Sequence, residues 1–133
     1  MTDPAAFQAP FAEYLGIKLT HVSAERVEAE LLVRKELCTV PDIMHGGAIM
    51  ALADNLGGVA TVVNLPKGAR TATIESKTNF FAAIPAGETA RAECTALHRG
   101  RTTMVWQTKI TRNDGKLCAL VLQTQIVIAA EKS

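Results

Sequence analysis

One stretch of the chain has the length and composition of a buried helix. From Gly47 to Val63, apolar residues fall on nearly every side of a helical projection, so no broad polar face is left for solvent. Such a helix should be surrounded by other structure. Gly57 and Gly58 lie in its second half, where each costs about 1 kcal/mol relative to alanine. The pair indicates either a kink or fraying, or the close approach of a neighbouring backbone or ligand.

Other segments alternate between apolar and polar residues in the manner of strands. Residues 17–33 alternate on both sides of the polar turn at 23–26, which predicts a hairpin. Residues 64–68 form a turn-rich exit from the helix. Beyond it, four more strands are expected, at Thr71 to Ala83, Glu88 to Arg99, Thr102 to Asn113 and Leu117 to Ile128. The sequence Asn113-Asp114-Gly115 before the last strand is typical of a hairpin turn.

The N-terminal segment reads as a short amphipathic helix from Pro4 to Leu15. Phe7, Phe11 and Tyr14 recur at three-to-four residue spacing, and Gly16 stands where a helix would end. This helix is expected to be a lid or flank.

The predicted order is a short helix, two strands, a long helix and four strands. One long apolar helix with an antiparallel sheet large enough to wrap it is an α+β arrangement. The chain has 133 residues and 48% hydrophobic content, which fits one domain spanning residues 1–133, with 1–15 as its helical flank.

Composition excludes several classes of function. A net charge of +1 gives no basic field for nucleic acid, and the N-terminus lacks the pattern of a secretory signal. The apolar stretch from Ile43 to Leu65 contains polar residues, which argues against a membrane span. A cytoplasmic protein without nucleic-acid or membrane partners is the expectation.

The cysteines and histidines predict no metal site. Cys38, Cys94 and Cys118 lack paired spacing, so they are expected to be reduced core thiols. No histidine has a neighbouring cysteine or acidic residue at useful spacing; the three are His21, His45 and His98.

The strongest chemical signal is a carboxylate, Asp54, in the middle of the apolar helix. An unpaired buried charge is costly, so such a residue is paired, exposed or used in function. The small residues of His45-Gly46-Gly47 at the helix start would leave backbone N–H groups open to a ligand. The structural alternatives are a hydrogen-bonded or ion-paired Asp54 and a capping His45.

These motifs resemble those of the hotdog-fold acyl-CoA thioesterases, specifically the phenylacetate-degradation branch. The resemblance extends from Tyr14 to Ile128. It rests on the helix motif, on the segment from Phe80 to Glu88, and on Arg99-Gly100-Arg101-Thr102. It implies a sheet wrapped around the central helix, and hydrolysis of an acyl- or aryl-CoA thioester to a free acid and coenzyme A without a cofactor.

The resemblance also implies roles for individual residues. The Gly46 amide would polarise the thioester carbonyl, with Gly47 as an accessory, and Asp54 would act as general base or nucleophile. His45 would position the thioester or hold local structure. Thr73 stands where related enzymes carry a hydroxyl that orients water, although threonine is also an ordinary strand residue.

Coenzyme A carries phosphate charges that a near-neutral chain must bind locally. Arg99, Gly100, Arg101 and Thr102 fall at an expected turn, where two guanidiniums, a hydroxyl and a flexible backbone could bind phosphate. The alternative is a solvated basic turn. Lys77 is a weaker candidate on a neighbouring strand.

Two further features concern the substrate. An acyl pocket could be lined by residues that are more often plain core, namely Tyr14, Met50, Leu56, Phe80 and Phe81. Many relatives have Asn or Gln about six residues before the motif histidine, whereas this chain has Thr39. A polar contact is therefore missing or supplied by another group.

Helix geometry separates the two halves of the expected site. At 1.5 Å per residue, His45 and Asp54 lie roughly 13 Å apart along the axis, and about 100° per residue places them on opposite faces. If both serve one thioester, a two-fold dimer must supply them from different chains. The expected assembly is a homodimer with two composite sites, or a homotetramer formed by two such dimers. The alternatives are a hotdog hydratase or dehydratase, and a non-catalytic acyl-CoA binding module.

Overall fold

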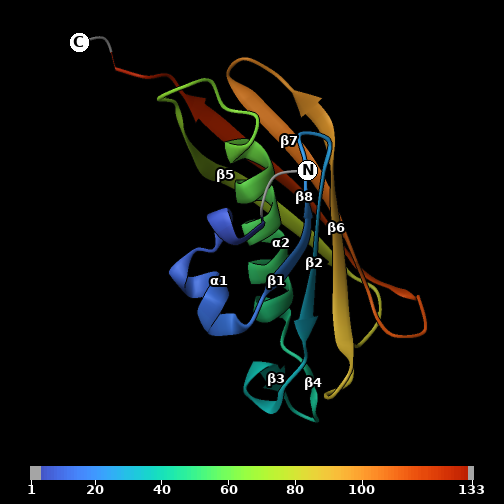
Figure 1. Ribbon diagram of the computed structural model, residues 1–133. Helices are drawn as coiled ribbons and strands as arrows, with labels where there is room; N and C mark the ends of the chain where they lie inside the picture. The colour runs from blue at the N-terminus through green and yellow to red at the C-terminus, as the bar shows by residue number, and fades with distance from the viewer. Residues whose placement is uncertain (1–3, 132–133) are drawn as a thin grey trace.

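The computed structural model describes residues 4–131. Its six-stranded antiparallel sheet curves around one long helix, and the N-terminal elements lie beside that helix (Figure 1). In chain order the elements are η1 (Pro4–Phe7), α1 (Pro10–Leu15), β1 (Lys18–Val22), β2 (Arg26–Leu32), η2 (Lys35–Leu37), β3 (Cys38–Thr39), β4 (Ile43–Met44), α2 (Gly46–Val62), β5 (Arg70–Phe80), β6 (Thr89–Arg99), β7 (Thr103–Thr111) and β8 (Leu117–Ile128). The predicted α+β class is confirmed.

The central helix α2 confirms the predicted buried helix, one residue earlier than expected at each end. Its buried residues are Ile49, Leu52, Ala53, Leu56, Gly57, Val59, Ala60 and Thr61. They pack against the concave face of the sheet and form the centre of the hydrophobic core. Asp54, the only charged residue of this helix, is exposed.

The strands form one sheet in the order β1-β2-β6-β7-β8-β5. The predicted hairpin is β1–β2, and the four later strands all form, although β5 ends at Phe80 rather than at Ala83. Gly115 has φ 86°, as the turn before β8 requires. The β1 and β5 strands lie at the two edges of the sheet, so the strand that follows α2 is an edge strand.

The N-terminal flank differs from the expected single helix. Gln8 and Ala9 separate η1 from α1, and α1 ends at Gly16, which has φ 88° and donates its N–H to the carbonyl of Ala12. The expected apolar face is wrong: Phe11 is 63% exposed and Tyr14 77% exposed, whereas the buried residues of α1 are Ala12 and Leu15.

A small two-stranded ribbon, β3–β4, leads into α2 and was not predicted. Its turn contains a cis peptide bond between Val40 and Pro41, and Asp42 has φ 63°. Strands of two residues carry too little periodicity to be found in a sequence. The ribbon places His45 directly before the first turn of α2.

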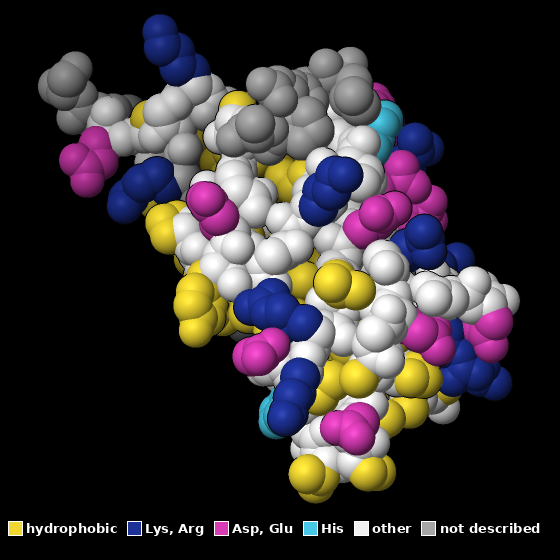
Figure 2. All heavy atoms as spheres, turned by 60° about the horizontal axis from the view of Figure 1, so that its bottom comes forward, with side chains coloured by type: hydrophobic (Ala, Val, Ile, Leu, Met, Phe, Trp, Pro, Cys, Tyr) yellow, Lys and Arg dark blue, Asp and Glu magenta, His cyan; other side chains and the backbone are white. Residues whose placement is uncertain are grey.

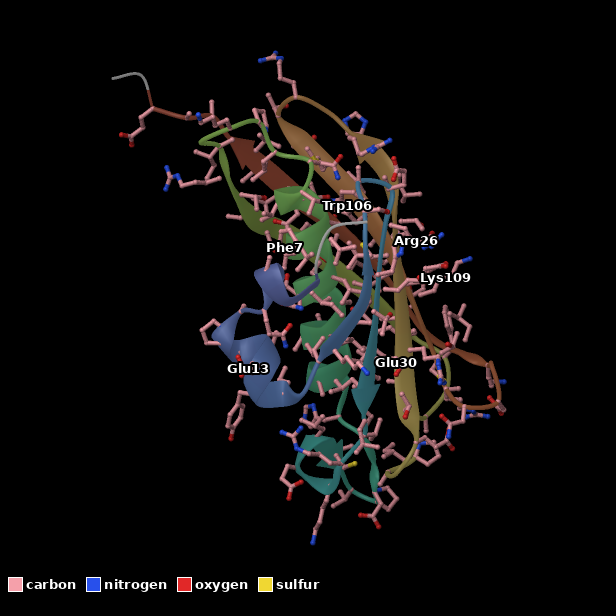
Figure 3. The ribbon with its side chains drawn as sticks, viewed as in Figure 1. Phe7, Glu13, Arg26, Glu30, Trp106 and Lys109 are labelled. Atoms are coloured by element: carbon pink, nitrogen blue, oxygen red, sulfur yellow. The ribbon has the colours of Figure 1, made fainter. Side chains whose placement is uncertain are left out.

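The core contains a buried polar chain between α2 and β7. Trp106 of β7 donates its indole N–H to the Thr61 hydroxyl at 2.9 Å, and Thr61 donates to the carbonyl of Gly57 at 2.8 Å. Figure 3 shows Trp106 between the sheet and the helix. These bonds satisfy groups that would otherwise be costly to bury.

Two of the three cysteines confirm the prediction of core thiols. Cys94 and Cys118 are buried, and Cys38 is half-buried beside the ribbon. Burial raises the pKa of the Cys94 thiol to about 12, while a hydrogen bond with Thr108 acts in the opposite direction. Cys94 therefore stays protonated at neutral pH.

The surface mixes both signs of charge. Figure 2 shows basic and acidic side chains interspersed on the face it presents, with apolar atoms between them. Within residues 4–131, no helix has the length and hydropathy needed to cross a membrane.

The two glycines of α2 stand in different surroundings. A Cβ on Gly57 would overlap the side-chain amide of Gln123 on β8, whereas a Cβ on Gly58 would meet no atom of residues 4–131 within 4 Å. Close approach, rather than a kink, accounts for Gly57. Gly58 has no such constraint.

We expect opposite effects on stability from the two alanine substitutions. Gly57→Ala should lower the free energy of unfolding by about 1–3 kcal/mol, because the new methyl group displaces a buried side chain. Gly58→Ala should raise it by about 0.5–1 kcal/mol through helix propensity. Urea unfolding of the two variants beside the unsubstituted protein measures the difference. Equal shifts in one direction would contradict the close contact at Gly57.

Candidate active site

The Asp54 carboxylate is held by neutral donors from two strands. Thr73 of β5 donates its hydroxyl to Asp54 Oδ1 at 2.9 Å, and Gln123 of β8 donates its amide to the same oxygen at 3.0 Å. The carboxylate itself is on the exposed side of α2. An ionised acceptor makes both hydrogen bonds stronger than their neutral counterparts. Asp54 is thus fixed in position without being buried.

A second glutamine extends this arrangement. Gln125 of β8 donates its amide to Thr73 Oγ1 at 2.9 Å, and its carbonyl oxygen lies 3.1 Å from Thr71 Oγ1. The sequence analysis did not identify either glutamine. The signal in the sequence was a polar residue at an expected core position. Residues 121, 123 and 125 of β8 all face the core, and the last two are glutamines.

The first residues of α2 form a different kind of site. His45 is the N-cap, and its Nδ1 accepts the Gly47 N–H at 2.8 Å. The carbonyl of His45 accepts the N–H groups of Ala48 and Ile49. Within residues 4–131, the Gly46 N–H makes no hydrogen bond. Of the two amides that the motif suggested, that of Gly47 is therefore occupied and that of Gly46 is available.

The hydrogen bond to Gly47 also fixes the state of the His45 ring. An acceptor Nδ1 carries no proton, so the neutral imidazole has its proton on Nε2. His45 is exposed, and this second nitrogen can donate to a ligand at the helix start.

The edge strand β5 passes both regions of α2. A Cβ built on Gly46 would lie 3.3 Å from two ring carbons of Phe80, at the end of β5, while Thr73 contacts Asp54 near its beginning. Phe80 is 52% exposed. The helix start and the carboxylate are thus both bordered by one edge of the sheet.

Each region opens into its own cleft. A cleft of about 440 Å³ beside Asp54 is lined by Phe7 and Gln8 of the N-terminal flank, together with Asn55 and Thr71. Figure 3 shows Phe7 directed from η1 towards α2. A second cleft, of about 240 Å³, lies beside His45 and Gly47 and is bordered by Phe11, Leu15, Leu37 and Cys38.

The arginine turn, formed by residues 99–102, lies near the C-terminal end of α2, away from Gly46. Arg99, Gly100 and Arg101 line a cleft of about 430 Å³ with Asn64. The Arg99 guanidinium donates to the carbonyl of Ala24 at 3.2 Å, while Arg101 is exposed. Thr102 is also exposed, and its carbonyl accepts the N–H of Val127.

Other candidates are not brought to these places within one chain. Lys77 is exposed in the middle of β5, where it pairs with Leu122 of β8. The arginine turn instead adjoins Ile126 of β8, which pairs with the beginning of β5. Thr39 is exposed on β3. Of the suggested acyl-pocket residues, Leu56 is fully buried core, and Phe81 and Tyr14 are exposed.

Within residues 4–131, no group of three or more His, Cys, Asp or Glu side chains is arranged to hold a metal ion.

Comparison with known proteins identifies the family. The family model described as the Thioesterase superfamily matches residues 42–119, which include α2 and most of the sheet. The chain belongs to the thioesterase superfamily. Its fold is the hotdog fold, and the protein is a thioester hydrolase.

Similar proteins cover most of the length of this thioesterase. The proofreading thioesterase EntH of Cronobacter turicensis is 30% identical over 106 residues, which are 80% of this chain and 77% of that protein. The 1,4-dihydroxy-2-naphthoyl-CoA hydrolase of Escherichia coli is 29% identical over 79% of this chain and 76% of its own.

Solved structures agree with the fold of this thioesterase. A thioesterase from Haemophilus influenzae superposes with a TM-score of 0.88 at 25% identity, covering 97% of this chain and 90% of that one. A variant of the phenylacetic acid degradation protein PaaI from Thermus thermophilus gives 0.82 at 25% identity, covering 89% and 98%. The expected membership of the hotdog-fold thioesterases is thereby confirmed.

Proposed function

We propose that this thioesterase hydrolyses acyl-CoA or aryl-CoA thioesters, with Asp54 of one chain and the Gly46 amide of a second chain at each active site. The observation that carries the proposal is the Asp54 carboxylate, which is exposed on an apolar helix and held by the neutral donors Thr73 and Gln123. A carboxylate that is held in place and open to solvent can act on a substrate or on water.

In the general-base route, water attacks the thioester carbonyl carbon while Asp54 removes one of its protons. The carbonyl oxygen gains negative charge and is stabilised by the Gly46 N–H, aided by the positive end of the helix dipole. Collapse of the tetrahedral intermediate breaks the C–S bond with its electron pair on sulfur, and the proton on Asp54 passes to the thiolate.

In the nucleophilic route, an Asp54 oxygen bonds to the carbonyl carbon and coenzyme A leaves as the thiolate. Water then hydrolyses the resulting anhydride, which restores the carboxylate and releases the acid, while the remaining proton of the water passes to the thiolate. Both routes use the same two groups. His45 would serve either route by donating from Nε2 near the carbonyl.

The arginine turn is a suitable site for the phosphates of coenzyme A. Arg99 is anchored by the Ala24 carbonyl, and the exposed Arg101 and Thr102 add a free guanidinium and a hydroxyl beside the cleft. The Escherichia coli relative is named for an aryl-CoA thioester, so aryl substrates belong in any assay beside acyl substrates.

The helix requires a second chain for this chemistry. It is continuous from Gly46 to Val62, so Gly46 and Asp54 of one chain remain about 12 Å apart along its axis and about 80° apart around it. A thioester carbonyl and its attacking group must be in contact. A dimer with antiparallel central helices would bring the Gly46 end of one chain to Asp54 of the other, twice.

The edge of β5 is the surface we propose for this dimer. β5 is an 11-residue edge strand that pairs with β8 on one side and, within residues 4–131, with no strand on the other. Long open edges readily pair with another chain. Ser76 and Thr78 have buried hydroxyls without a hydrogen-bond partner among residues 4–131, so a strand added at this edge could supply their hydrogen bonds.

The proposed composite site also implies a register for this pairing. Thr73 marks the level of Asp54 on β5, Phe80 marks the level of Gly46, and a bulge lies between Thr73 and Glu75. If the two-fold axis passes between the Lys77 residues of the two chains, Glu75 of one chain lies opposite Asn79 of the other. Because the bulge adds one residue before Glu75, Thr73 then lies opposite Phe80. Ser76 then lies opposite Thr78, a favourable hydroxyl pair across antiparallel strands.

The catalytic assignments predict losses of thiol release from acyl-CoA and aryl-CoA substrates. Asp54→Asn should lower kcat by roughly 10²–10⁴-fold, because the amide cannot act as a base or nucleophile of comparable strength. Gly46→Pro should lower it by about 10²–10³-fold by removing one N–H, at a position where helices accept proline.

Gly46→Ala is the matched control, because it adds a Cβ against Phe80 but keeps the N–H. It should retain far more activity than the proline variant. Undiminished thiol release by Asp54→Asn would remove this residue from the mechanism. Binding without turnover by the unsubstituted protein would favour a binding module, and hydration of an enoyl-CoA would favour a hydratase.

Composite sites predict recovery of activity when inactive chains are mixed. A heterodimer of Asp54→Asn and Gly46→Pro chains has one site with both substitutions and one with neither. Random exchange at equal concentrations makes half of the dimers mixed, so about a quarter of the original activity should return. Thiol release is measured after mass spectrometry has verified exchange. No recovery would contradict sites shared between chains.

The proposed register predicts disulfide formation across the two-fold axis. Lys77→Cys should form an intersubunit disulfide under mild oxidation, because directly opposed residues have Cα atoms about 4.5–5.5 Å apart. Glu75→Cys is the control: its two copies would be about 13 Å apart and should not cross-link. A mixture of Glu75→Cys and Asn79→Cys chains should cross-link, because these two positions lie opposite each other in the proposed register. Non-reducing gels measure all three, and efficient linkage of Glu75→Cys alone would contradict the register.

A further inference from the structure

Two glutamines are buried beneath the proposed active site. Gln123 is 1% exposed and Gln125 is 2% exposed, both on the face of β8 that packs against α2. A buried amide is costly unless its hydrogen bonds are made, and an apolar residue would serve simple packing better. Their contacts therefore point to a role beyond filling the core.

The direction of each hydrogen bond follows from the chemistry of the groups. The amide nitrogens of Gln123 and Gln125 can only donate, and they lie 3.3 Å and 2.9 Å from Thr73 Oγ1. The lone pairs of the Thr73 hydroxyl face these donors. Its single proton is then directed to Asp54 Oδ1 at 2.9 Å.

The two oxygens of Asp54 consequently differ. Oδ1 accepts from Thr73 and from Gln123, whereas Oδ2 accepts no hydrogen bond from any residue in the described part of the chain. We propose that Gln123 and Gln125 are positioning residues, which hold Asp54 through Oδ1 and leave Oδ2 as the oxygen that acts on water or on the thioester. This inference rests on the proposed function.

The absence of a side chain at Gly57 leaves room beside α2 for the Gln123 amide. Gly57 lies three residues after Asp54 on α2, and the Gln123 amide fills the space that a Cβ would need. The buried Oε1 of Gln123 has no hydrogen-bond partner in the part of the chain that the structure describes. Turning the amide over would place this oxygen against the carboxylate, so repulsion keeps the nitrogen towards Asp54.

The consequence is a carboxylate that keeps its orientation throughout the reaction. Whether Oδ2 takes a proton from water or bonds to the carbonyl carbon, the hydrogen bonds at Oδ1 need not break. Donors fixed in advance by a strand avoid reorganisation during the chemical step. Removing them should affect kcat more than KM.

The test replaces the donors with a side chain of similar length. Gln123→Met and Gln125→Met should each lower kcat for thiol release by about 10- to 100-fold, with KM changed by less than about threefold. Gln107→Met, the same change on β7 at a half-buried position opposite Leu122, is the control and should leave kcat unaltered. Unaltered kcat in both Gln123→Met and Gln125→Met would overturn the proposal.

A compensating pair separates positioning from packing. Gly57→Ala should displace the Gln123 amide, and Gly57→Ala with Gln123→Val should relieve the overlap. The double variant is expected to regain the melting temperature lost by Gly57→Ala while its kcat stays at least about tenfold low. Recovery of both would show that the glutamine only fills space.

A spectroscopic measurement tests the contact without relying on activity. The side-chain amide signals of Gln123, assigned by their loss in Gln123→Met, should shift and exchange faster with water in Asp54→Ala. Unchanged signals would overturn the contact. Absence of thiol release by the unsubstituted protein over the whole substrate panel would instead count against the proposed function.

Discussion

The hydrogen bond from Thr73 to Asp54 is the contact on which the arrangement of the site depends. It joins the only charged residue of the central helix to the edge strand that follows it. Because the donor is neutral, the carboxylate is held without an ion pair and remains open to solvent. Because this contact lies on an edge strand, the second chain of the proposed dimer would lie beside the same carboxylate.

Local patterns were sufficient for most of the fold. The buried helix, the first hairpin and the four later strands follow from hydrophobic periodicity and from turn residues such as Asn113 to Gly115. The N-terminal flank was predicted less well, because aromatic spacing suggested an apolar face. Ala12 and Leu15 of α1 pack against the domain instead, and Phe11 and Tyr14 face solvent. Such a choice depends on tertiary packing, which spacing alone does not encode.

The candidate site was predicted in part for similar reasons. Asp54 and the glycines at the helix start are unusual in their own local sequence, so they can be identified without a fold. Gln123 and Gln125 are ordinary residues until the register of β8 places them behind Thr73. The different surroundings of Gly57 and Gly58 likewise become visible only when the sheet lies against α2.

The bulge in β5 has a consequence for how this sequence can change in evolution. Thr73 and Phe80 are seven residues apart, an odd number, yet both contact the helix. Regular alternation would turn one of them away from α2, and the extra residue at the bulge restores the phase. Deletion of one residue between Glu75 and Phe80 would remove neither of these two side chains, but it would turn Thr73 and Phe80 to opposite faces of β5. Insertions and deletions in this strand should therefore be selected against even where substitutions at the same position are tolerated.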